Sequence, residues 1–216
     1  MRIAKVTLLL VLCLATLTAA QDSTTARPEA TGNSVTLGIV LDCSGSQRLQ
    51  LDHMLSAVKQ ISETLTENDR AFLVRFVDAA KISVVQELTS NRDEIVDAAD
   101  SLYIEGGQTA VIDAVYVSAK YLAKNDNSAG STRVFLLISD GDDRGSGKKL
   151  DDTVAFLKEN QIKVFAIGIS DLKVSSKVLD RFSKETGGKT FLPRTTVDLS
   201  NAIVSIAKLM RGAATK

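Results

Sequence analysis

The chain has 216 residues, and its 26 Lys and Arg residues balance 26 Asp and Glu residues, so the formal net charge is zero. No basic excess points to nucleic acid or to an anionic membrane surface as a partner. The length suits one domain with a substantial core and is short for two.

The first 20 residues have the pattern of a secretory signal peptide. Arg2 and Lys5 form a short basic start, residues 6–17 are apolar, and residues 18–20 are small, as at a cleavage site. The apolar run is too short to span a bilayer comfortably, and an uncleaved membrane anchor is the alternative. Cleavage would leave 24 basic against 26 acidic residues, because Arg2 and Lys5 are lost.

The expected mature chain has no membrane span and begins with a flexible leader, residues 21–33, rich in Ser, Thr and Ala without a periodic pattern. It keeps one cysteine, Cys43, and has no Asn-x-Ser/Thr sequon. A single cysteine cannot form an internal disulfide, and disulfides are common in animal extracellular domains. The lack of a disulfide and the lack of a sequon therefore favour export from a bacterium, to the periplasm or to the outside.

Apolar strands and helical periodicities alternate along residues 34–211, the predicted domain, and residues 212–216 form a frayed tail. Strands are predicted at 35–41, 71–77, 82–88, 133–139, 163–169 and 190–193. Helical spacing of apolar residues covers 49–65, 95–102, 110–122, 150–157, 178–182 and 199–210.

Strands that are apolar throughout need cover on both faces. The alternation therefore predicts an α/β fold with a mostly parallel sheet sandwiched between helices. Strands 71–77 and 82–88 are joined by a short turn, which predicts one antiparallel pair.

Two of the strands, 35–41 and 133–139, end in an acidic residue followed by a turn of small residues. Right-handed crossovers bring the carboxyl ends of parallel strands to one edge of the sheet, where open α/β sheets bind their ligands. We therefore expect Asp42 and Asp140 to approach each other.

Hydroxyl groups are expected to join these carboxylates. In an extended strand tip, Ser44 and Ser46 lie on the side of Asp42, and Gly45 permits a tight turn between them. A glycine loop ending in Thr109 opens a helix at the same edge. The candidate ligands are Asp42, Ser44, Ser46, Thr109 and Asp140. Cys43 alternates to the other side, which favours a buried core thiol over a redox or nucleophilic role.

Two carboxylates and three hydroxyls form an all-oxygen set. Such a set suits Mg²⁺, Mn²⁺ or Ca²⁺ rather than Zn²⁺ or Cu²⁺, which prefer nitrogen or sulfur. Mg²⁺ tends to keep water ligands, and hydroxyls add no charge. An acidic group from a partner could therefore replace one water.

Three short elements, in order along the chain, resemble those of the von Willebrand factor A family. Residues 42–46 resemble its Asp-x-Ser-x-Ser element, Thr109 after a glycine pair resembles the second, and residues 139–143 resemble the third, Ser-Asp-Gly-x-Asp. The resemblance covers about residues 34–211. It implies a Rossmann-like, doubly wound, six-stranded α/β sheet with one antiparallel edge strand, helices on both faces and a metal-ion-dependent adhesion site.

In that site, Ser44, Ser46 and Thr109 would be ligands, and Asp42 and Asp140 would bind the ion directly or through water. The resemblance gives Asp143 a supporting role, in which it holds the loop by hydrogen bonds.

The expected function is an exported, non-enzymatic binding module whose protein partner presents an acidic side chain to the ion. One alternative is a haloacid-dehalogenase-like phosphohydrolase with Asp42 as the nucleophile. Those enzymes usually carry a second acid two residues further on, where this chain has Ser44. A structural member of the family with an empty metal site is the other alternative. The chain has a single histidine, which offers little acid–base machinery.

Overall fold

A computed structural model describes residues 34–128, 130–171 and 173–212. The predicted signal peptide (1–20), the leader (21–33) and residues 213–216 of the predicted tail lie outside the described residues. Among the described helices, none has both the length and the apolar character that crossing a membrane would need.

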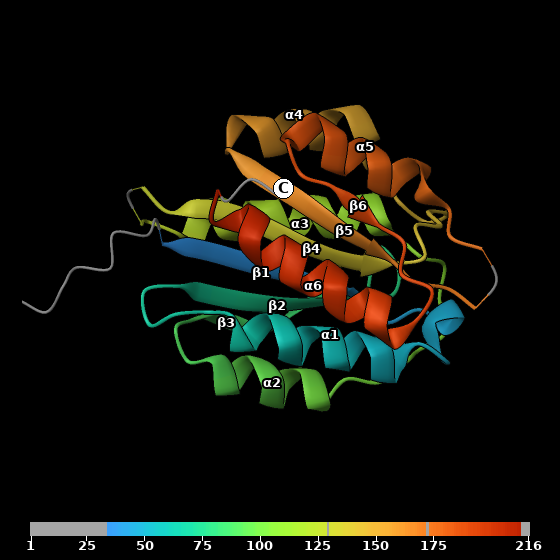
Figure 1. Ribbon diagram of the computed structural model, residues 1–216. Helices are drawn as coiled ribbons and strands as arrows, with labels where there is room; N and C mark the ends of the chain where they lie inside the picture. Colours follow the sequence, from blue (N-terminus) through green and yellow to red (C-terminus); the bar gives the residue numbers. More distant parts are fainter. Residues whose placement is uncertain (1–33, 129, 172, 213–216) are drawn as a thin grey trace, which may run out of the picture. The chain divides into compact units, whose positions relative to one another are not determined.

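Six strands form one sheet with the order β3-β2-β1-β4-β5-β6 (Figure 1). The strands are β1 Val35–Asp42, β2 Arg70–Phe76, β3 Ile82–Thr89, β4 Thr132–Ser139, β5 Ile162–Gly168 and β6 Thr190–Phe191. All neighbouring strands pair in parallel except β2 and β3, so β3 is an antiparallel edge strand. The predicted fold class, a mostly parallel six-stranded α/β sheet with one antiparallel edge, is confirmed.

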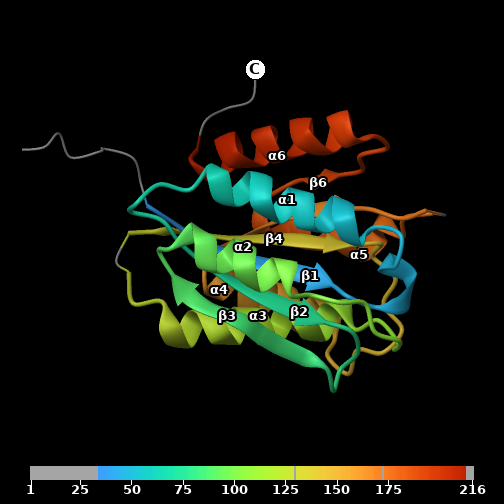
Figure 2. The same cartoon turned by 90° about the horizontal axis from the view of Figure 1, so that it is seen from below.

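Helices cover both faces of this sheet (Figures 1 and 2). They are α1 Leu51–Glu63, α2 Arg92–Asp100, α3 Val111–Asn125, α4 Leu150–Glu159, α5 Ser176–Thr186 and α6 Thr196–Met210. Buried side chains of α1, α2 and α6 share one core cluster with the sheet, and those of α3, α4 and α5 share the other. Every residue of β1 is buried, as a central strand with two covered faces requires.

The core is close-packed over the middle of β1. Gly38 has no side chain, and a Cβ atom there would lie 2.6 Å from the ring of Phe72 and 2.7 Å from that of Phe135. These two rings, from the strands on either side, meet edge to face with centroids 6.0 Å apart. The glycine therefore lets two large aromatic residues bridge three strands.

The prediction that the first helix includes Leu49 was wrong. A short 3-10 helix, Gly45–Gln47, follows β1, and α1 begins only at Leu51, with Gln50 as its N-cap residue. Leu49 lies in the turn between them and is 74% exposed. Its spacing is helical, but the residue precedes the helix.

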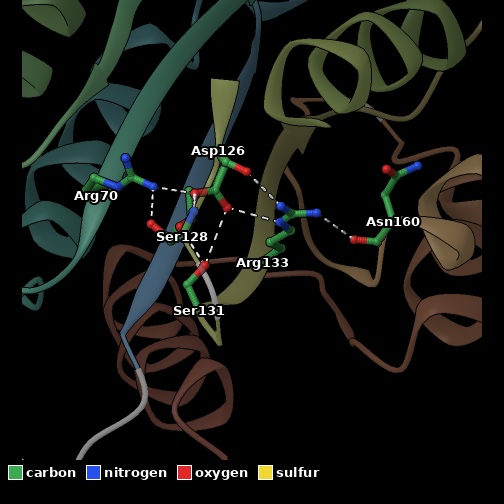
Figure 3. Close-up of polar contacts among 7 residues, drawn as sticks. Arg70, Asp126, Ser128, Ser131, Arg133 and Asn160 are labelled. Carbon is green, nitrogen blue, oxygen red and sulfur yellow. Dashed lines mark hydrogen bonds and ion pairs between the residues drawn. The ribbon is translucent and has the colours of Figure 1, made fainter. Parts of the chain in front are cut away.

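At the end of the sheet where β2 and β4 begin, a buried carboxylate joins segments that are distant in sequence (Figure 3). Asp126 follows α3 and pairs with Arg70 of β2 and with Arg133 of β4, and its carboxylate also accepts hydrogen bonds from Ser128 and Ser131. Burial alone would raise the pKa of Asp126, but the hydrogen bonds from Ser128 and Arg133 outweigh burial and lower it. This carboxylate therefore connects β2 and β4 at the strand ends that lie away from the candidate site.

Candidate metal centre

Three hydroxyl groups predicted as ligands lie together beyond the carboxyl end of β1. Thr109 Oγ1 donates a hydrogen bond of 3.1 Å to Ser44 Oγ, which lies 3.2 Å from Ser46 Oγ. Ser44 and Thr109 are buried, whereas Ser46 is exposed. The hydroxyls therefore form a row that runs from the interior to the surface.

Asp42 lies beneath this row and is fully buried. Its Oδ1 accepts a hydrogen bond of 3.0 Å from the backbone N–H of Ser44, and its Oδ2 accepts one of 2.6 Å from Ser139 Oγ. Burial raises the pKa of Asp42 to about 6, although the hydrogen bonds from Ser139 and Ser44 act in the other direction. The negative charge of Asp140 raises it further, so the two carboxylates are close enough to interact.

Ser139 is a site residue to which the sequence analysis assigns no role. It is fully buried at the end of β4, which pairs with β1 so that Leu41 lies opposite Ile138. The next residues along the two strands are Asp42 and Ser139. The available signal was its place as the first residue of the Ser-Asp-Gly-x-Asp element, at the end of a strand next to β1.

Asp140 is held by a turn that requires a glycine. Its Oδ1 accepts a hydrogen bond from the Asp142 N–H, and its carbonyl oxygen accepts one of 2.7 Å from the Ser175 N–H. Gly141 has φ +76°, and a Cβ atom on it would lie 2.2 Å from the Ser175 carbonyl oxygen. Only glycine fits this contact without strain, which explains the residue type after Asp140.

Asp143 holds the start of α3, the helix that follows Thr109. The N-cap residue of α3, Ala110, has no side chain that could accept a hydrogen bond from the helix. Asp143 Oδ1 instead accepts from the Ile112 N–H at 3.2 Å and from Ser146 Oγ at 2.6 Å. A carboxylate from a distant loop thus caps α3, which is favourable at a helix N-terminus.

The loop before Thr109 is tethered to the strands at Glu105. Its N–H donates to the Cys43 carbonyl oxygen, and its carboxylate pairs with Arg75 at 3.1 Å and with Lys81 at 2.5 Å. Arg75 also lies over the Tyr103 ring, 4.5 Å from its centroid. These contacts hold the loop before Thr109 against the residue that follows β1 and against β2.

Cys43 lies in the core on the other side of β1 and is fully buried. Burial raises the pKa of its thiol to about 11, although the nearby Arg75 guanidinium acts in the opposite direction. The thiol therefore stays protonated at neutral pH. This state agrees with the predicted core thiol and offers no reactive nucleophile.

The donor set fits a hard divalent cation. In the part of the chain that the structure describes, neither Asp42 nor Asp140 has a Lys or Arg ion-pair partner. A cation would supply the missing opposite charge between the two buried acids. No described group of three or more His, Cys, Asp or Glu side chains could hold a metal ion, so such a site would depend on the hydroxyls.

Comparison with known proteins identifies the fold. Comparison with curated protein sequences gives no match. Among solved structures, a von Willebrand factor type A protein from Catenulispora acidiphila is 21% identical with a TM-score of 0.70, over 82% of this chain and 43% of that chain. Proximal thread matrix protein 1 from the mussel byssus is 20% identical with a TM-score of 0.65, over 83% and 46% of the two chains.

The pilus adhesin SpaC from Lactobacillus rhamnosus GG, in an open conformation, is 14% identical with a TM-score of 0.64, over 83% of this chain and 30% of that chain. This chain thus spans less than half the length of each of these three chains, and the likeness shows the fold alone. The von Willebrand factor type A domain profile matches residues 37–205. The chain therefore belongs to the von Willebrand factor type A domain family.

Proposed function

We propose that this chain is an exported module that binds a protein partner through a divalent cation at the carboxyl edge of its sheet. The observation that carries the proposal is the pair of buried acids, Asp42 and Asp140, next to three clustered hydroxyls and without a basic partner among the described residues. Domains of this family are typically protein-interaction modules, and the structures that share the fold include a pilus adhesin.

In this proposal the cation is Mg²⁺, or Mn²⁺ or Ca²⁺, and all its protein donors are oxygens. Ser44, Ser46 and Thr109 are ligands, while Asp42 and Asp140 bind directly or through water. The exposed side of Ser46 leaves room for a Glu or Asp carboxylate from the partner. The predicted signal peptide, residues 1–20, delivers the module to the periplasm or outside a bacterial cell.

A phosphohydrolase with Asp42 as the nucleophile fits the geometry less well. Asp42 is fully buried, and both of its carboxylate oxygens accept hydrogen bonds. A nucleophilic oxygen needs access to the phosphorus atom that it attacks. The residue two positions further on, Ser44, has no proton-donating carboxyl group to serve as a general acid.

Calorimetric titration with Mg²⁺ and Mn²⁺ tests the proposal. We expect Ser44→Ala and Asp140→Ala to weaken metal binding by at least about tenfold, since each removes an oxygen donor, and to leave the fold intact. Asp97→Ala is the matched control, because Asp97 is exposed on α2 and lies outside the site. Unchanged metal affinity in both site variants would refute the metal site. A pull-down with and without chelator then tests whether partner capture depends on the ion.

A further inference from the structure

Two exposed side chains beside the hydroxyl row are held on a rigid backbone. Arg48 and Leu49 follow the Gly45–Gln47 turn, and the Arg48 N–H donates to the Gly45 carbonyl oxygen. Leu49 is three residues from Ser46, the exposed hydroxyl of the row. At 74% exposure it is the most exposed large apolar side chain in the described part of the chain.

Buried glutamines on both sides hold this turn in place. Gln47 is fully buried and its amide contacts the Ile169 carbonyl oxygen at 3.5 Å, while the Gln50 amide donates to the Asp171 carboxylate. The Gln50 N–H also donates to the Gln47 carbonyl oxygen at 2.9 Å. Leu49 is thus presented to solvent by an ordered backbone, so a partner would contact it without first ordering the loop.

A second basic side chain also lies near the site. The backbone N–H of Arg144 donates to the Thr109 carbonyl oxygen at 2.9 Å, which places Arg144 beside the start of α3. Its guanidinium pairs with Asp142 at 2.7 Å, yet 73% of the side chain is exposed. Leu49 lies just before α1 and Arg144 lies beside the start of α3, and these two helices pack on opposite faces of the sheet.

Exposed basic side chains near the site are available to pair with an acidic partner. A divalent cation would neutralise Asp42 and Asp140. Arg48 is exposed and has no ion-pair partner among the described residues, and Arg144 is largely exposed although it pairs with Asp142. Basic groups around a binding site attract acidic segments and repel basic ones.

We infer that the partner segment carries, next to the carboxylate that binds the ion, an apolar side chain that contacts Leu49 and a second acidic side chain that pairs with Arg48 or Arg144. This inference rests on the proposed metal-dependent function and adds the chemistry of the partner. Leu49 supplies an apolar anchor, and the two arginines select the charge of the flanking residues.

Selection from random peptides displayed on phage tests this inference. Peptides are captured by the immobilised protein in Mg²⁺ and released with a chelator. We expect the released peptides to contain Glu or Asp, and to be enriched, relative to the unselected library, in an apolar neighbour and a second acid. Leu49→Ser should abolish the apolar enrichment and weaken the binding of a selected peptide about tenfold, with Mg²⁺ affinity unchanged. The double variant Arg48→Glu and Arg144→Glu should shift the flanking preference to Lys and Arg.

Val204→Ser and Arg92→Glu are the matched controls, because both residues are exposed on helices outside this edge and should leave the preferences unchanged. Released peptides that contain Glu or Asp but whose flanking residues match the library, or that are unchanged by Leu49→Ser, would overturn this inference and leave the proposed function standing. The absence of acidic residues, or of any chelator-released peptide, would overturn both.

Discussion

Replacing Asp42 by Asn separates the stability of the protein from its proposed metal binding, because the substitution removes a charge and nearly keeps the shape. Asp42 is fully buried, and no Lys or Arg among the described residues pairs with it. Burial raises its pKa to about 6, against 3.8 for an ordinary Asp. Keeping this carboxylate ionised at neutral pH therefore costs the folded state free energy in the absence of metal.

The magnitude follows from the two pKa values. The difference between 3.8 and about 6 corresponds to about 3 kcal/mol, at about 1.4 kcal/mol for each pKa unit. The folded state holds the proton of Asp42 more tightly than the unfolded chain does, so protonation stabilises the fold by this amount. The stabilisation is fully present below pH 3.8 and is lost as the pH rises through about 6. Above that pH, the ionised Asp42 makes the folded protein less stable by about 3 kcal/mol than an uncharged residue would.

The asparagine side chain in the Asp42→Asn variant would still accept the hydrogen bond from the Ser44 N–H. Its amide nitrogen would receive none from Ser139, which costs about 1 kcal/mol. We therefore expect the substitution to raise the free energy of unfolding by about 2 kcal/mol near neutral pH without metal. The advantage should vanish near pH 4, where Asp42 is protonated in the folded wild-type protein.

Urea unfolding with a chelator, at both pH values, measures this difference. Adding Mg²⁺ at about 100 times its dissociation constant should stabilise the wild-type protein by about 2.7 kcal/mol and the variant hardly at all. Asp97→Asn, which removes a charge from the exposed face of α2, should show neither effect. The reasoning fails if the Asp42 variant is the less stable protein without metal near neutral pH, or if Mg²⁺ stabilises both proteins equally.

Two further predictions concern other contacts. Asp126→Asn should destabilise the protein by about 3 kcal/mol at neutral pH, because it leaves Arg70 and Arg133 without their shared buried partner. Because the pKa of Asp126 is lowered in the folded protein, the stability that it contributes is present above the ordinary Asp pKa and is lost as the pH falls through the lowered one. The stabilities of the wild type and the variant, measured by unfolding at decreasing pH, should therefore converge. A difference in stability that stays constant with pH would contradict this. Gly141→Ala should cost more than about 2 kcal/mol, from its positive φ and its contact with Ser175, and should weaken Mg²⁺ binding. Thermal unfolding and calorimetry measure both effects, and a variant as stable as the wild type would show that the turn adapts.

The layered fold and the approach of the two acids could be predicted from residue patterns. The middle parts of β1 and β4 are buried on both faces, so apolar residues occupy consecutive positions, 39–41 and 134–138, and not only alternate ones. Once the strands are parallel, the handedness of the crossovers brings their carboxyl ends to one edge. This rule is independent of loop sequence, which is why Asp42 and Asp140 could be paired without a structure.

The sequence by itself determined the elements, their order and the oxygen donors that gather at one edge. Only the tertiary structure decided that Ser139 bonds to Asp42, that Asp143 caps α3, and that Leu49 is exposed beside Ser46. Each of these depends on contacts between segments far apart in the chain, and local periodicity carries no information about such contacts. Leu49 shows the limit most clearly. Its spacing from the apolar residues that follow is helical, but the contacts of Gln47 and Gln50 with the segment after β5 hold it in the turn before the helix begins.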